Sequence, residues 1–128
     1  MPAEKIHSLL YYATMFVGDS QTMTSEAAIL GTPALKCNSF AGLLAVPNEI
    51  ENKYGLCYCY RQDRVDDMFS KISELLAMPN LKQEWQRRRQ KMLSDKIDVT
   101  AFFTWFIENY PESAKVMREN PDYQRRFR

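Results

Sequence analysis

One stretch of sequence decides the fold: Gly18-Asp19-Ser20-Gln21-Thr22-Met23-Thr24-Ser25-Glu26-Ala27-Ala28-Ile29-Leu30-Gly31-Thr32-Pro33. Two apolar runs flank it, Tyr12–Val17 and Pro33–Asn38, and each has the length and composition of a strand that is covered on both faces. Between them we expect a short helix over Ser25–Leu30, ended by Gly31 and Pro33. Strand, helix and strand form a parallel βαβ unit, which binds ligands at the carboxyl ends of its strands. The polar turn Asp19–Thr22 lies at that end and is the candidate site.

The rest of the chain is expected to be mainly helical. The sequence predicts a helix over residues 5–13, a first strand over Thr14–Gly18 and a third strand over Leu56–Tyr60. Asp63 is expected to cap the next helix. Apolar spacing predicts three further helices. The apolar face of the first consists of Val65, Met68, Phe69, Ile72, Leu75 and Leu76, and that of the second consists of Leu81, Trp85 and Met92. The third has the face Val99, Phe102, Phe103, Phe106, Ile107 and Tyr110.

These elements predict an α/β fold, a Rossmann-like three-layer α/β/α half-domain with a short parallel sheet of about three strands and a helical C-terminal third. We expect one Rossmann-like domain over residues 1–96, followed by an aromatic helix and basic tail over 97–128. A sheet of so few strands has open edges, which are a liability. The chain therefore reads as the C-terminal piece of a longer protein, or as one whose edge another copy or subunit covers.

Composition excludes several classes of function. The chain has 128 residues, 45% hydrophobic and 26% charged, with a net charge of +1, which favours neither nucleic acid nor a membrane surface. No apolar window reaches the roughly 18 residues of a membrane span, and no signal peptide is recognisable, so we expect a cytoplasmic protein. The basic residues after Lys82 alternate with acidic ones, as on a solvated helix face.

Three cysteines do not form a disulfide framework. Cys57 and Cys59 lie on the third predicted strand and Cys37 on the second, where we favour buried thiols over metal or redox chemistry. His7 has no evident second ligand, so no metal site and no cofactor is predicted.

The polar turn permits two interpretations. A helix N-terminus with free N–H groups binds phosphate, and Ser20 and Thr22 add hydroxyl donors. Glu26 would then accept hydrogen bonds from sugar hydroxyls. Alternatively, Ser20 or Thr22 only caps the helix and Glu26 only suits its dipole. Asp19 closes the turn with an Asx-type bond of its side chain, or acts as a base if it is buried.

The run D-S-Q-T-M-T-S-E-A-A-I-L-G-T-P resembles the nucleotide-binding turn in the C-terminal half of GT-B-fold proteins. These include the UDP-N-acetylglucosamine 2-epimerases and the peptidoglycan N-acetylglucosaminyltransferases. The chain is most similar to a related group of unknown function typified by D-S-x-T-M-x-x-E-A-A-x-L-G-T-P. Lys53–Leu56 and Ile97–Thr100 also resemble that group.

The resemblance implies a UDP-type nucleotide-sugar ligand. The implied ligand-binding residues are Asp19, Ser20, Gln21, Thr22, Met23 and Glu26, with the diphosphate at Ser20–Met23 and the ribose at Glu26. Gln21 and Thr22 stand where the enzymes have glycine, which limits close backbone approach to phosphate. The N-terminal domain of the two-domain enzymes is not matched, so catalytic residues stay unassigned and the chain alone is expected to be catalytically incomplete. The alternative is a ligand-free module that self-associates through its sheet edge and aromatic helix.

Overall fold

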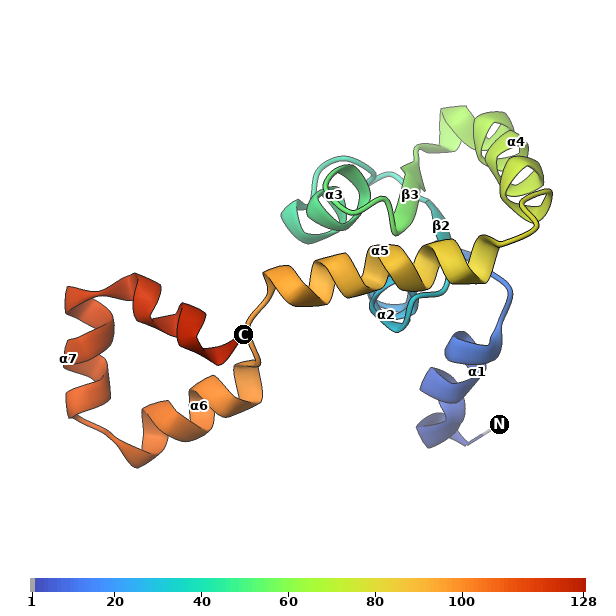
Figure 1. Cartoon of the computed structure of the whole chain (residues 1–128). Coiled ribbons are helices and arrows are strands. Elements are labelled where there is room, and N and C mark those ends of the chain that lie inside the picture. The colour runs from blue at the N-terminus through green and yellow to red at the C-terminus, as the bar shows by residue number, and fades with distance from the viewer. Residues whose placement is uncertain (1) are drawn as a thin grey trace. The chain divides into compact units, whose positions relative to one another are not determined.

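The structure is a computed structural model that describes residues 2–128 (Figure 1). Its elements in order are η1 (Ala3–Lys5), α1 (Ile6–Tyr12), β1 (Phe16–Gly18), α2 (Gln21–Leu30), β2 (Ala34–Cys37), α3 (Ala45–Asn52), β3 (Cys57–Tyr60), η2 (Gln62–Arg64), α4 (Val65–Leu76), α5 (Leu81–Asp95), α6 (Val99–Glu108), α7 (Glu112–Glu119) and η3 (Pro121–Phe127). The chain forms two compact units, one up to Gln90 and one from Lys91 on.

The three strands form one parallel sheet in the order β1-β2-β3. Because each crossover in a parallel sheet is right-handed and both steps run in the same direction, α2 and α3 must cover the same face. The structure therefore confirms the predicted α/β fold with a short parallel sheet of three strands.

The two faces of the sheet can be told apart by side-chain alternation along the strands. On one face Lys36 of β2 contacts Gln21 of α2, and the Cys57 thiol lies 3.9 Å from the carbonyl of Pro47 in α3. On the other face the Tyr58 ring packs against Trp85 of α5, with ring centroids 6.4 Å apart. Helices on both faces give the predicted three layers.

The predicted start of α2 was wrong by four residues. The helix begins at Gln21 rather than Ser25, because Ser20 is its N-cap and accepts a hydrogen bond from the Met23 N–H at 3.3 Å. The alternative that Ser20 caps the helix is therefore confirmed. The Thr24 hydroxyl donates to the Ser20 carbonyl at 2.7 Å and supports the same turn. The C-terminal end of α2 is as predicted, since Gly31 adopts the left-handed conformation with φ 80°.

The predicted cap of α4 was also wrong. Asp63 lies inside the 3-10 helix η2 and makes no capping bond, and α4 begins only at Val65. Met68 and Leu75 of its apolar face are buried, but Phe69 and Leu76 are more than half exposed. Regular apolar spacing thus predicted this helix correctly but did not show how much of its apolar face is buried.

The second unit has an aromatic cluster that spacing predicted only in part. Asp98 caps α6, and its Phe102 and Trp105 pack on Phe127 and Tyr123 of η3, the segment expected to be a basic tail. Trp105 was not assigned to the apolar stripe. The stripe residues that point to solvent are Val99, Phe103, Ile107 and Tyr110.

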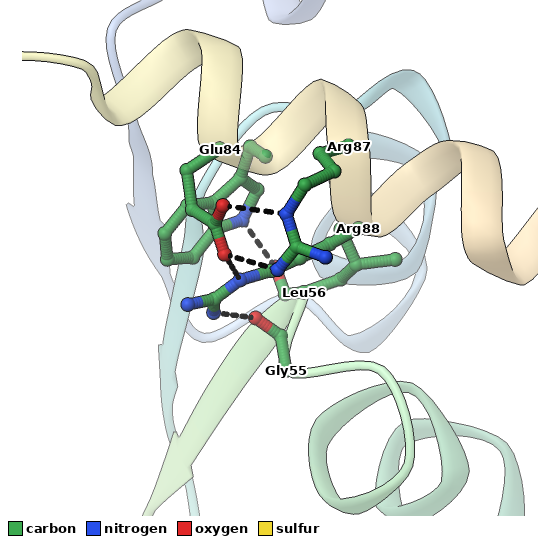
Figure 2. A network of polar contacts seen from close by, with 6 residues as sticks. Gly55, Leu56, Glu84, Arg87 and Arg88 are labelled. Carbon is green, nitrogen blue, oxygen red and sulfur yellow. Dashed lines mark hydrogen bonds and ion pairs between the residues drawn. The ribbon is translucent and has the colours of Figure 1, made fainter.

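Helix α5 fastens the first unit through side chains that donate to backbone carbonyls. Trp85 is fully buried, as its spacing with Leu81 and Met92 predicted, and its indole N–H donates to the Leu56 carbonyl at 2.9 Å. Arg88 donates to the Gly55 carbonyl at 2.6 Å, just before β3 (Figure 2). At the C-terminal end of α2, Gln86 donates to Leu30 and Arg89 to Ile29.

Glu84 binds Arg88 and its neighbour Arg87. Figure 2 shows its carboxylate between Arg87 and Arg88, and each guanidinium donates to it at 2.8 Å. The hydrogen bonds from Arg87 and Arg88 lower the pKa of Glu84 from 4.5 to about 2. A carboxylate stabilised in this way favours the folded state only while it is ionised.

The substitution Glu84→Gln is therefore expected to change how stability depends on pH. Because the folded pKa is depressed, the contribution of Glu84 is present above pH 4.5 and is lost as the pH falls toward about 2. The difference in free energy of unfolding between wild type and variant should be largest near neutral pH and shrink across that window. Urea denaturation at several pH values measures it.

Glu4→Gln is the matched control, since Glu4 is exposed and has no described ion pair within residues 2–128. A Glu84→Gln variant whose stability runs parallel to wild type from neutral pH to pH 2 would contradict this role of Glu84.

Candidate functional site

The candidate site lies where the carboxyl ends of the three strands meet. Asn38, directly after β2, donates from its side-chain amide to the Asp19 carbonyl at 3.0 Å, and its backbone N–H donates to the Tyr60 carbonyl at 3.1 Å. This one residue therefore ties together the ends of all three strands. In open α/β sheets this edge is where ligands bind.

Some hydrogen-bonding groups of the predicted turn residues already have partners within the protein, and others do not. Ser20 is half-buried, and its hydroxyl is used as the cap of α2. Met23 is half-buried too, and its N–H is the one that this cap satisfies. The backbone N–H groups of Gln21 and Thr22 have no acceptor among the described residues. The N-terminus of α2 thus keeps two donors for an anion, at the positive end of its dipole.

Asp19 is exposed, so the burial that a general base would need is absent. The turn is closed through its carbonyl, which accepts the Asn38 bond, and within residues 2–128 no hydrogen bond to its carboxylate is described. The predicted Asx-type bond of the Asp19 side chain was therefore wrong, and the backbone carbonyl of Asp19 closes the turn instead.

A hollow of about 440 Å³ adjoins the N-terminus of α2. Gln21, Thr22 and Ser25 line one side of it, and Leu44–Pro47 line the other. Thr22 is exposed, and its hydroxyl has no described partner within residues 2–128. The lining offers polar groups from α2 opposite an apolar wall.

Glu26 lies one turn further along α2 and borders a different hollow, which is also lined by His7, Ile29 and Leu30. Its side chain is 35% exposed, and one carboxylate oxygen lies 3.4 Å from His7 Nε2 of α1. The structure thus brings Ser20, Gln21 and Thr22 together and places Glu26, which is accessible, at a separate hollow.

Lys36 is the residue of this site that sequence reasoning missed. It is 1% exposed, and its ammonium donates to the Gln21 side-chain carbonyl in the first turn of α2. Within residues 2–128 no carboxylate lies within 4 Å of it, although a buried charge is costly unless it is paired. The signal was a lysine inside the otherwise apolar strand Ala34–Cys37.

A buried ammonium next to a helix N-terminus places two positive features together without a counter-ion. Such an arrangement suits an anion with several oxygens, such as a phosphate or a diphosphate. The described residues contain no group of three or more His, Cys, Asp or Glu side chains placed to hold a metal ion.

Comparisons of the chain with protein-family models, curated proteins and solved structures find no match. The GT-B resemblance consequently stays a prediction. Across residues 2–128, no helix combines the length and the apolar character that a membrane crossing requires.

The substitution Lys36→Met is expected to stabilise the fold by ~1–3 kcal/mol, because it removes a buried charge that lacks a counter-ion and keeps the volume of the side chain. Gln21 is only half-buried and can turn its amide to water. Urea denaturation at neutral pH measures the change.

Lys5→Met serves as the control, since Lys5 is exposed and the change there should lie within about 0.5 kcal/mol of zero. A Lys36→Met variant that is less stable than wild type would contradict this prediction, because the ammonium would then stabilise the fold without any ligand.

Proposed function

We propose that this chain binds a UDP-type nucleotide sugar and is the binding half of a glycosyltransferase-like or 2-epimerase-like protein. The observation that carries the proposal is Lys36, a buried ammonium without a carboxylate partner beside the N-terminus of α2. The diphosphate would take the place of the Gln21 side-chain oxygen on Lys36 and accept hydrogen bonds from the N–H groups of Gln21 and Thr22. Gln21 is then the group that the ligand displaces.

Glu26 supports the same ligand. A carboxylate one turn after a phosphate-binding N-terminus is placed to accept hydrogen bonds from ribose hydroxyls, and its side chain is accessible. His7 is exposed and can move away from Glu26 at little cost. The diphosphate and ribose contacts therefore come from one helix and the strand beside it.

Titration calorimetry tests this with UDP, dUDP, UDP-N-acetylglucosamine and inorganic pyrophosphate. Wild type should bind UDP and the UDP-sugar, and bind dUDP on the order of ten-fold more weakly, because dUDP lacks a hydroxyl that donates to Glu26. Glu26→Ala should remove the preference for UDP over dUDP. Lys36→Met should abolish binding of every diphosphate, pyrophosphate included.

Glu74→Ala is the matched control, since Glu74 is exposed on α4 and far from the candidate site in the sequence. Absence of heat with all four ligands at millimolar concentration, from wild type that is folded by circular dichroism, would overturn the proposal.

Self-association is the second candidate function, favoured by one observation on α6. Val99, Phe103 and Ile107 of α6, and Tyr110 just after it, are each more than half exposed and recur at helical spacing. A continuous apolar stripe of this kind is typical of a surface that meets another protein surface.

If a second copy of the chain covers this stripe, sedimentation velocity should show a dimer that dissociates on dilution. Ile107→Asp should then give a monomer, because a charge cannot be buried there without a partner. Thr104→Asp is the control, since Thr104 is not part of the stripe. A wild-type monomer at high micromolar concentration would exclude this function.

A further inference from the structure

A cavity at the opposite edge of the sheet lies outside the nucleotide-binding proposal. It has a volume of about 240 Å³ and is lined by residues 12–14 and 31–33, which precede β1 and β2, and by Leu76, Met78, Pro79, Leu81 and Lys82. Because the strands are parallel, this is the amino edge of the sheet, whereas the candidate site lies at the carboxyl edge. The cavity and the candidate site share no residue.

The wall of the cavity is held in place by burial and hydrogen bonds. Thr32 is buried, and its hydroxyl donates to the Leu10 carbonyl of α1 at 2.8 Å. Pro33 is also buried, and its carbonyl accepts a hydrogen bond from the Phe16 N–H of β1 at 2.8 Å. Leu81 is buried in the first turn of α5. The cavity is thus formed without a ligand, as ligand sites usually are.

The lining is largely apolar, and two of its large side chains remain exposed at the mouth. Tyr12, the last residue of α1, is 77% exposed, and Leu76, the last residue of α4, is 57% exposed. Contact of this apolar surface with water is unfavourable, and an apolar ligand in the cavity would remove part of it from water.

Lys82 is the only charged side chain in the lining, as far as the described residues go. Its ammonium lies 5.2 Å from the centre of the Tyr11 ring and 5.8 Å from that of Tyr12, so the two rings hold it at the mouth. Within residues 2–128 no carboxylate is described within 4 Å of this ammonium. An aromatic ring attracts a cation without neutralising it, so the charge is available to an anion.

A single ammonium suits a ligand with a single negative charge. The exposed Thr14 hydroxyl, which has no described partner within residues 2–128, adds one polar group to the lining. A diphosphate needs more donors than these two side chains provide, whereas a carboxylate accepts a charge-assisted hydrogen bond from one ammonium. Sites for drug-sized ligands begin at about 300 Å³, so this smaller cavity fits a smaller apolar group.

We propose that the cavity binds a small monocarboxylate with an apolar body, the chemical class to which medium-chain fatty acids belong. The apolar body packs against Pro33, Leu76 and Leu81, and the carboxylate lies at the mouth and accepts a hydrogen bond from the Lys82 ammonium. This ligand is separate from the nucleotide sugar, so neither proposal depends on the other.

The test titrates the folded chain with octanoate, octanamide, hexanoate and acetate and follows the nuclear magnetic resonance signals of the Leu76 methyl groups and the Tyr12 ring. Octanoate should shift both signals in a saturable way. Hexanoate should bind roughly ten-fold more weakly, because it buries two fewer methylene groups, and acetate should not bind. Octanamide has the same length without the charge and should bind several-fold more weakly than octanoate. Absence of a shift with millimolar octanoate, or equal affinity for octanoate and octanamide, would overturn the proposal.

Substitutions assign the two parts of the ligand. Lys82→Gln should reduce octanoate binding to the level of octanamide, Lys82→Arg should keep the preference, and Lys5→Gln on the exposed η1 is the matched control. Leu76→Gln should weaken binding of both ligands, measured from the Tyr12 signal. Leu43→Gln is its control, because Leu43 is 69% exposed outside the cavity. Equal effects of a substitution and its control would refute the assignment.

Lys36→Met separates this cavity from the candidate site. It should leave octanoate binding unchanged. Loss of octanoate binding in Lys36→Met but not in Lys82→Gln would place the carboxylate at the N-terminus of α2 and refute the proposal. Signals of Leu76 and Tyr12 that shift with protein concentration in the absence of octanoate would assign the cavity to a second copy of the chain, and would refute it as well.

Discussion

The hydrogen bonds that α5 donates to backbone carbonyls are the constraint on which the rest of the first unit depends. Trp85 and Arg88 bind the carbonyls that precede β3, and Gln86 and Arg89 bind those at the C-terminal end of α2. A cation at a helix C-terminus compensates the negative end of its dipole. The C-terminal end of α2 is thus satisfied inside the protein, while its N-terminal end is left to face the carboxyl edge of the sheet.

Local sequence patterns explain which parts of the fold and of the candidate site could be predicted and which could not. Apolar strand-length runs, Gly31 and Pro33 were enough for the βαβ unit, because burial on both faces and a left-handed C-cap leave few alternatives. The N-terminal end of α2 was predicted only as an alternative, with Ser20 or Thr22 as the cap, since Gln21, Thr22 and Met23 show no apolar periodicity and the cap depends on one hydroxyl. Lys36 was not assigned to the site, because a lysine in a strand is ordinarily expected to be solvated. The burial of Lys36 depends on packing between the sheet and the helices.

Lys36 joins the central strand to the N-terminus of α2. Its ammonium contacts Gln21 in the first turn of that helix and is 1% exposed. A buried cation without a counter-ion is a cost to the fold that an anionic ligand can offset.

The length of the outer strands has a consequence for how the chain meets its neighbours. β1 has three residues and β3 has four, so each edge of the sheet exposes only a few backbone donors and acceptors. Very short edge strands are one of the ways in which proteins avoid edge-to-edge pairing. A strand from another molecule would gain little by adding here, which makes cross-β aggregation from this sheet unfavourable and leaves side-chain surfaces to determine assembly.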